Sequence, residues 1–216
     1  YAQHTQLIQF LKYMCRLGTE CFVPRIPKRP SNMYTPYVFT HEEMSRIMEA
    51  IDKSEQKVFR PQSCLICMPC LFRLLYSTGM RISEALNIKN GDVNFQSDLI
   101  FLTKTKNGKE RIIPMNPELK VVLSQYMKYR DMMPVEGICK PERHLFVSGI
   151  GKPFTATTPY TFFKKILRQC GIAHKGKKQG PRVHDLRHTF AVHTLQKMAT
   201  EGVDLYAGLP VPSVLL

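Results

Sequence analysis

Apolar residues recur at helical spacing in several separate stretches of the chain. They lie three or four positions apart in residues 5–17 and 41–52, and they form a denser run in residues 64–76. The pattern returns in residues 117–130, 159–170 and 184–198. Because the buried face of a helix repeats every 3.6 residues, we expect each stretch to be a helix. An apolar stretch that begins near Leu209 predicts one more.

Residues that favour helix ends flank these stretches. Thr40 and Glu43 have the spacing of a capping box, in which each side chain bonds to the backbone N–H near the other. Asn116 and Thr158 each stand before a proline, which predicts a helix start at both places. Gly171 follows the 159–170 stretch and predicts its end.

Two β-prone runs, residues 99–102 and 111–114, flank the dipeptide Asn107-Gly108. Asn-Gly between such runs is a strong signal for a β-hairpin. Residues 145–147 predict a further short strand. The sequence therefore predicts an α+β fold that is mostly α-helical and has a small, three-stranded antiparallel sheet.

Prolines and basic residues gather between the first two predicted helices. Pro24, Pro27, Pro30 and Pro36 lie among arginines and lysines, which is typical of an extended basic linker. We therefore expect an amino-terminal helical piece in residues 1–22, a linker in residues 23–39 and one domain in residues 40–216.

The charge of the chain favours a polyanionic partner. The 216 residues include 31 Lys and Arg against 17 Asp and Glu, a net charge of +14. Residues 164–187 hold eight of these basic residues and one acidic residue, which is half of the net charge. A merely soluble surface would mix the two signs, although a solvated basic loop is the alternative. Nucleic acid is the first partner to expect.

Other features of the composition narrow the setting. No apolar run reaches the roughly 18 residues of a membrane span, and no signal peptide opens the chain. Seven cysteines, an odd number, favour a reducing cytoplasm. Cys64, Cys67 and Cys70 invite a metal reading, but a zinc site needs a second, distant pair. Buried free thiols are the preferred interpretation, and no metal or cofactor is expected.

Three local patterns carry the residues that phosphoryl transfer needs. Arg81 follows a glycine break at a helix start, with Glu84 on the same face, although an ordinary surface ion pair would look the same. Lysines crowd the tip of the 104–111 hairpin, which could also be a solvated turn. His184, Arg187 and His188 share one face of a helix, where a histidine with a structural role is the alternative.

Together these groups could hold a phosphate and move a proton. Positive side chains stabilise the negative charge of a phosphoryl transition state. The sequence contains neither a carboxylate cluster nor a glycine-rich phosphate loop, so neither a metal-dependent nuclease nor an NTPase is supported.

The three motifs, in this order and at this separation, resemble the tyrosine recombinase (phage integrase) family. They are residues 75–86, the hairpin 106–114, and residues 184–191. The resemblance covers residues 40–216, the catalytic domain, and implies an integrase-like fold. It also implies that residues 1–22 are the last helix of an amino-terminal core-binding domain.

The resemblance implies a role for each motif residue. Arg81 and Arg187 correspond to the arginines that hold the scissile phosphate. Lys106, or Lys104 in another register, corresponds to the general acid, and His184 to a catalytic histidine. Glu84 and His188 are expected to support these groups. The remaining basic side chains expected to contact DNA are Lys104, Lys109, Arg111, Lys175, Lys177, Lys178 and Arg182.

The implied activity is site-specific DNA strand exchange through a 3′-phosphotyrosine, without a cofactor. A mobile-element integrase is preferred because of the long 198–209 connection and the extra residues 131–144. An Xer-like chromosome dimer resolvase, a type IB topoisomerase-like enzyme and an inactive DNA-binding module are the alternatives. The family's nucleophilic tyrosine is expected beyond Leu216, and Tyr206 lies too early for that role. The 216 residues should therefore be inactive and monomeric alone, whereas the family assembles as tetramers on DNA. The expected location is the bacterial cytoplasm, at the nucleoid.

Overall fold

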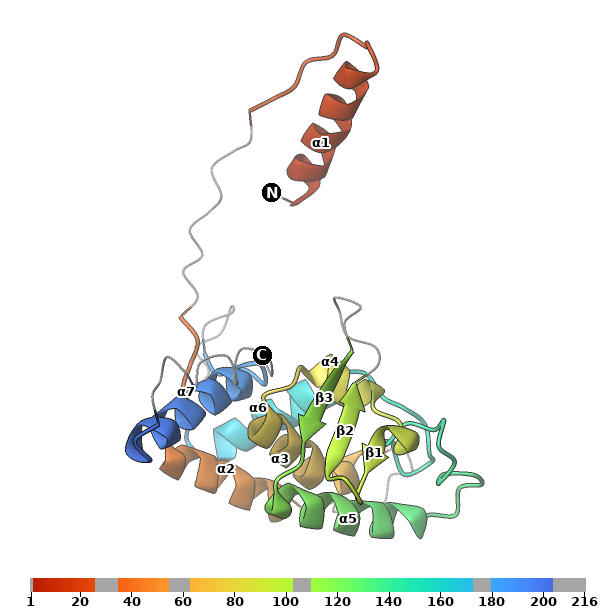
Figure 1. Cartoon of the computed structure of the whole chain (residues 1–216), viewed down its shortest axis with the longest axis vertical. Coiled ribbons are helices and arrows are strands. Elements are labelled where there is room, and N and C mark those ends of the chain that lie inside the picture. The colour runs from red at the N-terminus through yellow and green to blue at the C-terminus, as the bar shows by residue number, and fades with distance from the viewer. Residues whose placement is uncertain (1, 26–34, 55–62, 103–109, 173–179, 204–216) are drawn as a thin grey trace. The chain divides into compact units, whose positions relative to one another are not determined.

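A computed structural model describes residues 2–25, 35–54, 63–102, 110–172 and 180–203 of the chain (Figure 1). The chain divides into two compact units, residues 1–35 and residues 36–216. None of the helices in the described ranges is long and apolar enough to cross a membrane.

In its described residues the first unit contains one helix, α1 (Ala2–Arg16), and the chain that turns back at its end. Gly18 has φ +86°, a left-handed conformation that suits glycine because it has no Cβ. The N–H of Thr19 donates to the carbonyl of Met14, and the N–H of Gly18 donates to that of Cys15. These two bonds form a Schellman motif, which ends the helix.

The second unit combines helices with one small sheet. In chain order its elements are α2 (His41–Asp52), the 3₁₀ turn η1 (Leu65–Cys67), α3 (Met68–Thr78), α4 (Ile82–Asn87), the 3₁₀ turn η2 (Asn90–Asp92), β1 (Val93–Asn94), β2 (Leu99–Leu102), β3 (Arg111–Pro114), α5 (Pro117–Asp131), α6 (Thr157–Gln169) and α7 (Asp185–Thr200).

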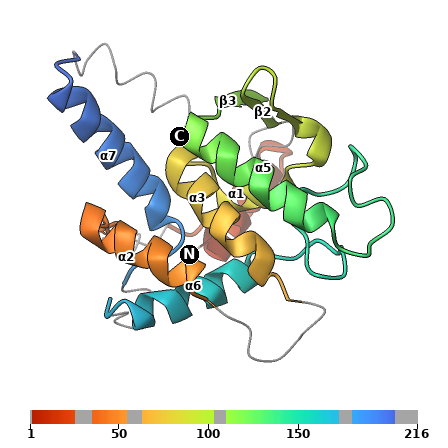
Figure 2. The same ribbon diagram turned by 90° about the horizontal axis from the view of Figure 1, so that it is seen from below.

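Helix α3 is the centre of this unit. It contacts α2, α5 and α7, and Figure 2 shows it between these three helices. Leu71, Phe72 and Leu74 on α3 are completely buried. The ring of Phe72 stacks on that of Phe163 from α6, with 5.1 Å between the ring centroids. Burial on most sides explains why the sequence of this helix is a dense apolar run, and the half-buried Arg73, Tyr76 and Ser77 share its one less buried face.

The predicted helix starts are confirmed at two of three places. Thr40 accepts from the N–H of Glu43, and the Glu43 carboxylate accepts from the N–H of Thr40, so the capping box forms. Asn116 accepts from the N–H of Leu119 at 2.7 Å. The expectation for Thr158 was wrong, because α6 begins at Thr157 and no side chain caps it.

The sheet is antiparallel, in the order β1-β2-β3. Strand β2 pairs with β3 from Leu99 opposite Pro114 to Leu102 opposite Arg111, as expected for a hairpin. The Asn107-Gly108 tip lies outside the described residues. The third strand is Val93–Asn94, which pairs with β2.

The prediction of a strand at residues 145–147 was wrong, although these residues are buried. The segment makes one isolated bridge beside it, between Lys89 and His144. The carbonyl of Leu145 accepts instead from the Tyr126 hydroxyl and from the guanidinium of Arg130. The N–H of Leu145 donates to the carbonyl of Ile88, but side chains satisfy its carbonyl, so no strand ladder continues from the bridge.

Candidate active site

The turn between α3 and α4 positions the first candidate residue, Arg81. Gly79 ends α3 with φ +62°, and its N–H donates to the carbonyl of Leu75. Thr78 closes the same turn, because its hydroxyl donates to the carbonyl of Leu74 at 2.6 Å. Arg81 then stands in extended conformation as the residue before α4. The chain therefore turns tightly at Gly79, and Arg81 lies directly after this turn.

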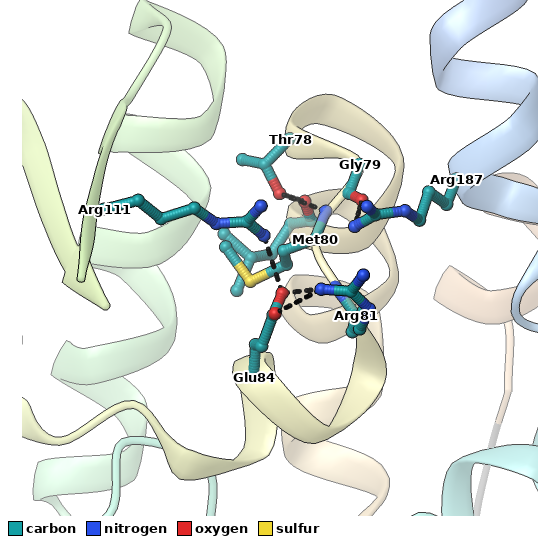
Figure 3. A network of polar contacts seen from close by, with 8 residues as sticks. Thr78, Gly79, Met80, Arg81, Glu84, Arg111 and Arg187 are labelled. Carbon is teal, nitrogen blue, oxygen red and sulfur yellow. Dashed lines mark hydrogen bonds and ion pairs between the residues drawn. The ribbon is translucent and has the colours of Figure 1, made fainter. Parts of the chain in front are cut away.

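Glu84 joins Arg81 to the sheet (Figure 3). Its carboxylate accepts from the backbone N–H of Arg81 and from the Arg81 guanidinium, both at 2.9 Å. It also accepts from the guanidinium of Arg111 on β3, at 2.6 Å. The Glu84 side chain is 3% exposed, whereas those of Arg81 and Arg111 are 33% and 14% exposed. One buried carboxylate thus links two arginines from different elements.

Arg187 reaches the same turn from α7. It is buried, and its guanidinium donates to the carbonyl of Gly79 at 2.8 Å. Figure 3 shows its guanidinium beside the turn that carries Arg81. Burial lowers the pKa of Arg187 to about 10, and the positive charges of Arg81 and Arg111 act in the same direction. Arg187 therefore stays charged at neutral pH, in a setting where other cations oppose its charge.

His184 and His188 lie at the amino-terminal end of α7. Their rings meet edge to face, with 5.2 Å between the centroids. Loss of hydration at the His184 ring lowers its pKa, and the charges of His188 and Arg187 lower it further. A neutral imidazole at neutral pH follows, which can accept a proton.

The buried Asp185 fixes this end of α7. Its carboxylate accepts from the backbone N–H of Arg182, and its carbonyl accepts from the Thr189 hydroxyl. The Thr189 hydroxyl in turn accepts from the N–H of Phe39. Hydrogen bonds to Arg182 and, through Thr189, to Phe39 therefore fix the start of the helix that carries His184 and Arg187.

The structure brings together Arg81, Glu84 and Arg187, as the sequence analysis expects, and places His184 and His188 on the helix of Arg187. The other predicted lysines lie outside the described residues: Lys104, Lys106, Lys109, Lys175, Lys177 and Lys178. Arg182 is half-buried, and it precedes α7.

Arg111 has a contact that sequence reasoning missed. Arg111 was expected to contact DNA, and the structure pairs it with Glu84. Its position at the first residue of β3, directly opposite Leu102, turns it toward α4. Spacing along the chain carries no signal for this pair, because 27 residues separate the two side chains.

A separate cavity of about 690 Å³ lies between α2, α3, α5 and α7. His41 and His193 stack in its wall at 3.8 Å between ring centroids, and the Tyr76 hydroxyl bonds to His193 Nδ1 at 2.7 Å. Arg81, Glu84 and Arg187 are not among its lining residues. The candidate phosphate site and this cavity are thus different features of the unit.

Among the residues that the structure describes, no group of three or more His, Cys, Asp and Glu side chains could hold a metal ion. Cys64, Cys67 and Cys70 are buried and form no disulfide, as expected. Burial raises the pKa of all three.

The sequence model of the phage integrase family matches residues 37–207, a range that includes Arg81, Glu84, Arg111 and Arg187. The chain belongs to the phage integrase family. Its membership agrees with the fold, since the XerA recombinase crystal structure superposes with a TM-score of 0.60 at 28% identity. That match covers 91% of this chain and 64% of the XerA chain.

Curated members of the phage integrase family are similar along most of the chain. The tyrosine recombinase XerC of Chlamydia caviae is 33% identical over 182 residues, 84% of this chain and 50% of XerC. The integrase/recombinase y4rB of Sinorhizobium fredii is 31% identical over 191 residues, 88% of this chain and 60% of y4rB. The chain therefore spans about half the length of the curated relatives it matches.

A lambda integrase tetramer bound to a Holliday junction has the same fold, with a TM-score of 0.67 at 16% identity. The match covers 99% of this chain and 56% of the integrase chain. The catalytic domains of this family are thus mostly helical with a small sheet, as this chain is.

Proposed function

We propose that residues 36–216 bind duplex DNA and belong to a site-specific recombinase that breaks and rejoins DNA strands. The observation that carries the proposal is the gathering of three arginines, since Arg81 and Arg111 bond to the Glu84 carboxylate and Arg187 donates to the Gly79 carbonyl of the same turn. Three positive side chains against one negative leave a net charge of +2 in a partly buried site. A phosphate diester would supply the missing negative charge.

Family membership and the DNA-bound lambda integrase support DNA as the source of that phosphate. We propose that the Arg81 and Arg187 guanidiniums hold the non-bridging oxygens of the scissile phosphate. A tyrosine hydroxyl attacks the phosphorus, a 3′-phosphotyrosine forms, and the 5′ oxygen leaves. The two arginines stabilise the charge that builds up on the phosphoryl oxygens.

The proton steps fall to the two remaining motifs. Lys106 is the proposed general acid that protonates the leaving 5′ oxygen. His184, which its surroundings keep neutral, is the proposed partner for the proton of the attacking hydroxyl. Glu84 and His188 are the proposed supports of Arg81 and His184. The basic side chains of the hairpin and of residues 175–182 are proposed to contact neighbouring phosphates.

We also propose that the 216 residues alone make no covalent link to DNA. The hydroxyls of Tyr37, Tyr76 and Tyr126 are bonded to Glu43, His193 and the Leu145 carbonyl. Tyr206 lies outside the described residues. We propose further that the 216 residues alone are monomeric in solution and that the recombinase assembles as a tetramer on DNA. Its proposed location is the bacterial nucleoid, and its proposed role is in a mobile element.

The proposed DNA binding is tested by selecting a duplex from a random library with this chain and measuring its affinity. Arg81→Met should weaken binding less than tenfold, because many other basic residues contact phosphates. The exposed Arg143, changed to Met, is the matched control for the lost charge. A preference for single strands, or no selected sequence at all, would contradict site-specific duplex recognition.

An adduct assay on a nicked form of the selected duplex tests the chemistry. The chain alone should give no covalent adduct, and a chain continued beyond Leu216 by the matching segment of XerC should give one. Arg81→Met in that continued chain should abolish it. An adduct on Tyr206 would contradict the assignment, and relaxation of supercoiled DNA without a defined site would favour a topoisomerase instead.

A further inference from the structure

Two thiols meet at the end of α1, outside the unit that carries the arginines. The sulfur atoms of Cys15 and Cys21 are 3.1 Å apart. The Cys15 thiol also contacts the Cys21 carbonyl at 3.5 Å, and the Cys21 thiol donates to the carbonyl of Leu11 at 3.2 Å. Leu11 and Cys15 are four residues apart and therefore share one face of the helix. Cys21 lies against that face.

The Schellman turn at Gly18 is what brings the two thiols together. It reverses the chain within three residues of the helix end, so that Cys21 runs back beside the last helical turn. The turn is visible at the carboxy-terminal end of α1 in Figure 1. The contact is therefore built by local backbone bonds and does not depend on the second unit.

The two thiols differ in access. Cys15 is exposed, whereas Cys21 is half-buried. The hydrogen bond to Cys15, and then burial, raise the pKa of the Cys21 thiol. Among the other cysteines, Cys139 is exposed and the remaining four are buried. An oxidant from solution thus meets Cys15 directly, with Cys21 next to it.

We propose that Cys15 and Cys21 are a disulfide-forming pair that reacts with hydrogen peroxide. The Cys15 thiolate attacks one peroxide oxygen and becomes a sulfenic acid, and hydroxide leaves. The Cys21 sulfur then attacks the Cys15 sulfur, the S–S bond forms, and the sulfenic oxygen leaves as water with the Cys21 proton. The sulfurs must approach by about 1 Å to reach a disulfide bond of about 2.05 Å. A dithiol reductant reverses the product by exchange.

The disulfide would act on the path of the chain between the two units. It closes a ring over residues 15–21 and ties the exit of the chain to the last turn of α1. The Pro-rich residues 23–39 start from that exit. Oxidation should therefore restrict the directions in which that segment leaves the helix. Residues of the arginine cluster take no part, so this proposal stands or fails separately from the proposed function.

Peptide mapping of the peroxide-treated chain tests the pair. Trypsin should release residues 13–16 and 17–25 joined through Cys15 and Cys21, with a total mass 2 Da below the sum of the two peptides, and dithiothreitol should separate them. Cys139→Ser, which removes another exposed thiol, should leave the joined product unchanged. Joined peptides that instead contain Cys139, or unjoined peptides with over-oxidised Cys15, would overturn the proposal.

A second variant tests the order of the steps. In Cys21→Ser, dimedone should label Cys15 at least tenfold more than in the wild type, because the sulfenic acid has no thiol beside it. In Cys15→Ser, Cys21 should resist peroxide. Equal dimedone labelling of Cys15 in the wild type and in Cys21→Ser would show that Cys21 does not capture the sulfenic acid.

Discussion

The substitution Glu84→Gln removes the one negative charge that holds Arg81 and Arg111 together. The side chain keeps nearly the same shape, so packing around α4 is retained. Its oxygen can still accept one hydrogen bond, but its amide group then points a donor at the other guanidinium. Two arginines 30 residues apart in the chain lose their common partner.

The burial of the three side chains sets the size of the effect. Breaking a buried ion pair by removing one partner costs about 3–5 kcal/mol. Glu84 is almost wholly buried, but Arg81 and Arg111 are 33% and 14% exposed, so solvent screens part of the loss. We therefore expect about 3 kcal/mol of lost folding stability. For a domain of this size that is a fall in Tm of roughly 6–12 °C.

Thermal unfolding followed by circular dichroism measures the effect. Glu142→Gln, at an exposed position, makes the same change of charge and should shift Tm by less than about 2 °C. Non-specific DNA affinity should not fall in Glu84→Gln, because the variant gains positive charge. Equal melting temperatures of the two variants would show that Glu84 does not hold the two arginines together.

The remaining predictions concern pH, a buried arginine and salt. The pKa of His184 in the folded chain lies below its ordinary value of about 6.5, so the unfolded chain takes up the proton first as pH falls. The stability that this group contributes is therefore present above about pH 6.5 and lost below it. An NMR titration of the folded chain should show the lowered pKa of His184, and His188→Asn should raise it. Arg130→Met should cost about 3 kcal/mol in urea unfolding, because it removes the donor to the Asn90 side-chain oxygen and the cation paired with Asp131, while the Leu145 carbonyl keeps the Tyr126 hydroxyl; a loss below about 1 kcal/mol would contradict that role. Arg187→Met should reduce the salt slope of duplex binding by about one, and an unchanged slope would count against a phosphate contact.

Helices were the most predictable part of this fold. Their apolar periodicity and their caps are local, and Thr40 with Glu43 or Asn116 with Leu119 form bonds within one turn. Residues 145–147 show where prediction from the local sequence pattern fails. They are apolar and buried like a strand, yet Tyr126 and Arg130, from a helix behind them, satisfy Leu145.

The residues of the candidate site were predictable, but the contacts between them were not. Arg81, Glu84 and Arg187 stand out through motifs, and the family resemblance orders them. The pairing of Arg111 with Glu84 and the bond from Arg187 to the Gly79 carbonyl span 27 and 108 residues. Only the fold sets such contacts. Arg130, fully buried under the 138–147 segment, gives no sign in the sequence that it differs from a surface arginine.

Arg81 and Arg187 are proposed to hold the same phosphate of a DNA duplex. Methylphosphonate scanning tests this by neutralising one phosphate of the selected duplex at a time and measuring the affinity of the wild type, Arg81→Met and Arg187→Met. We expect one phosphate whose neutralisation weakens the wild type but has little effect on either variant. Coupling of the two arginines to different phosphates, or to none, would contradict it.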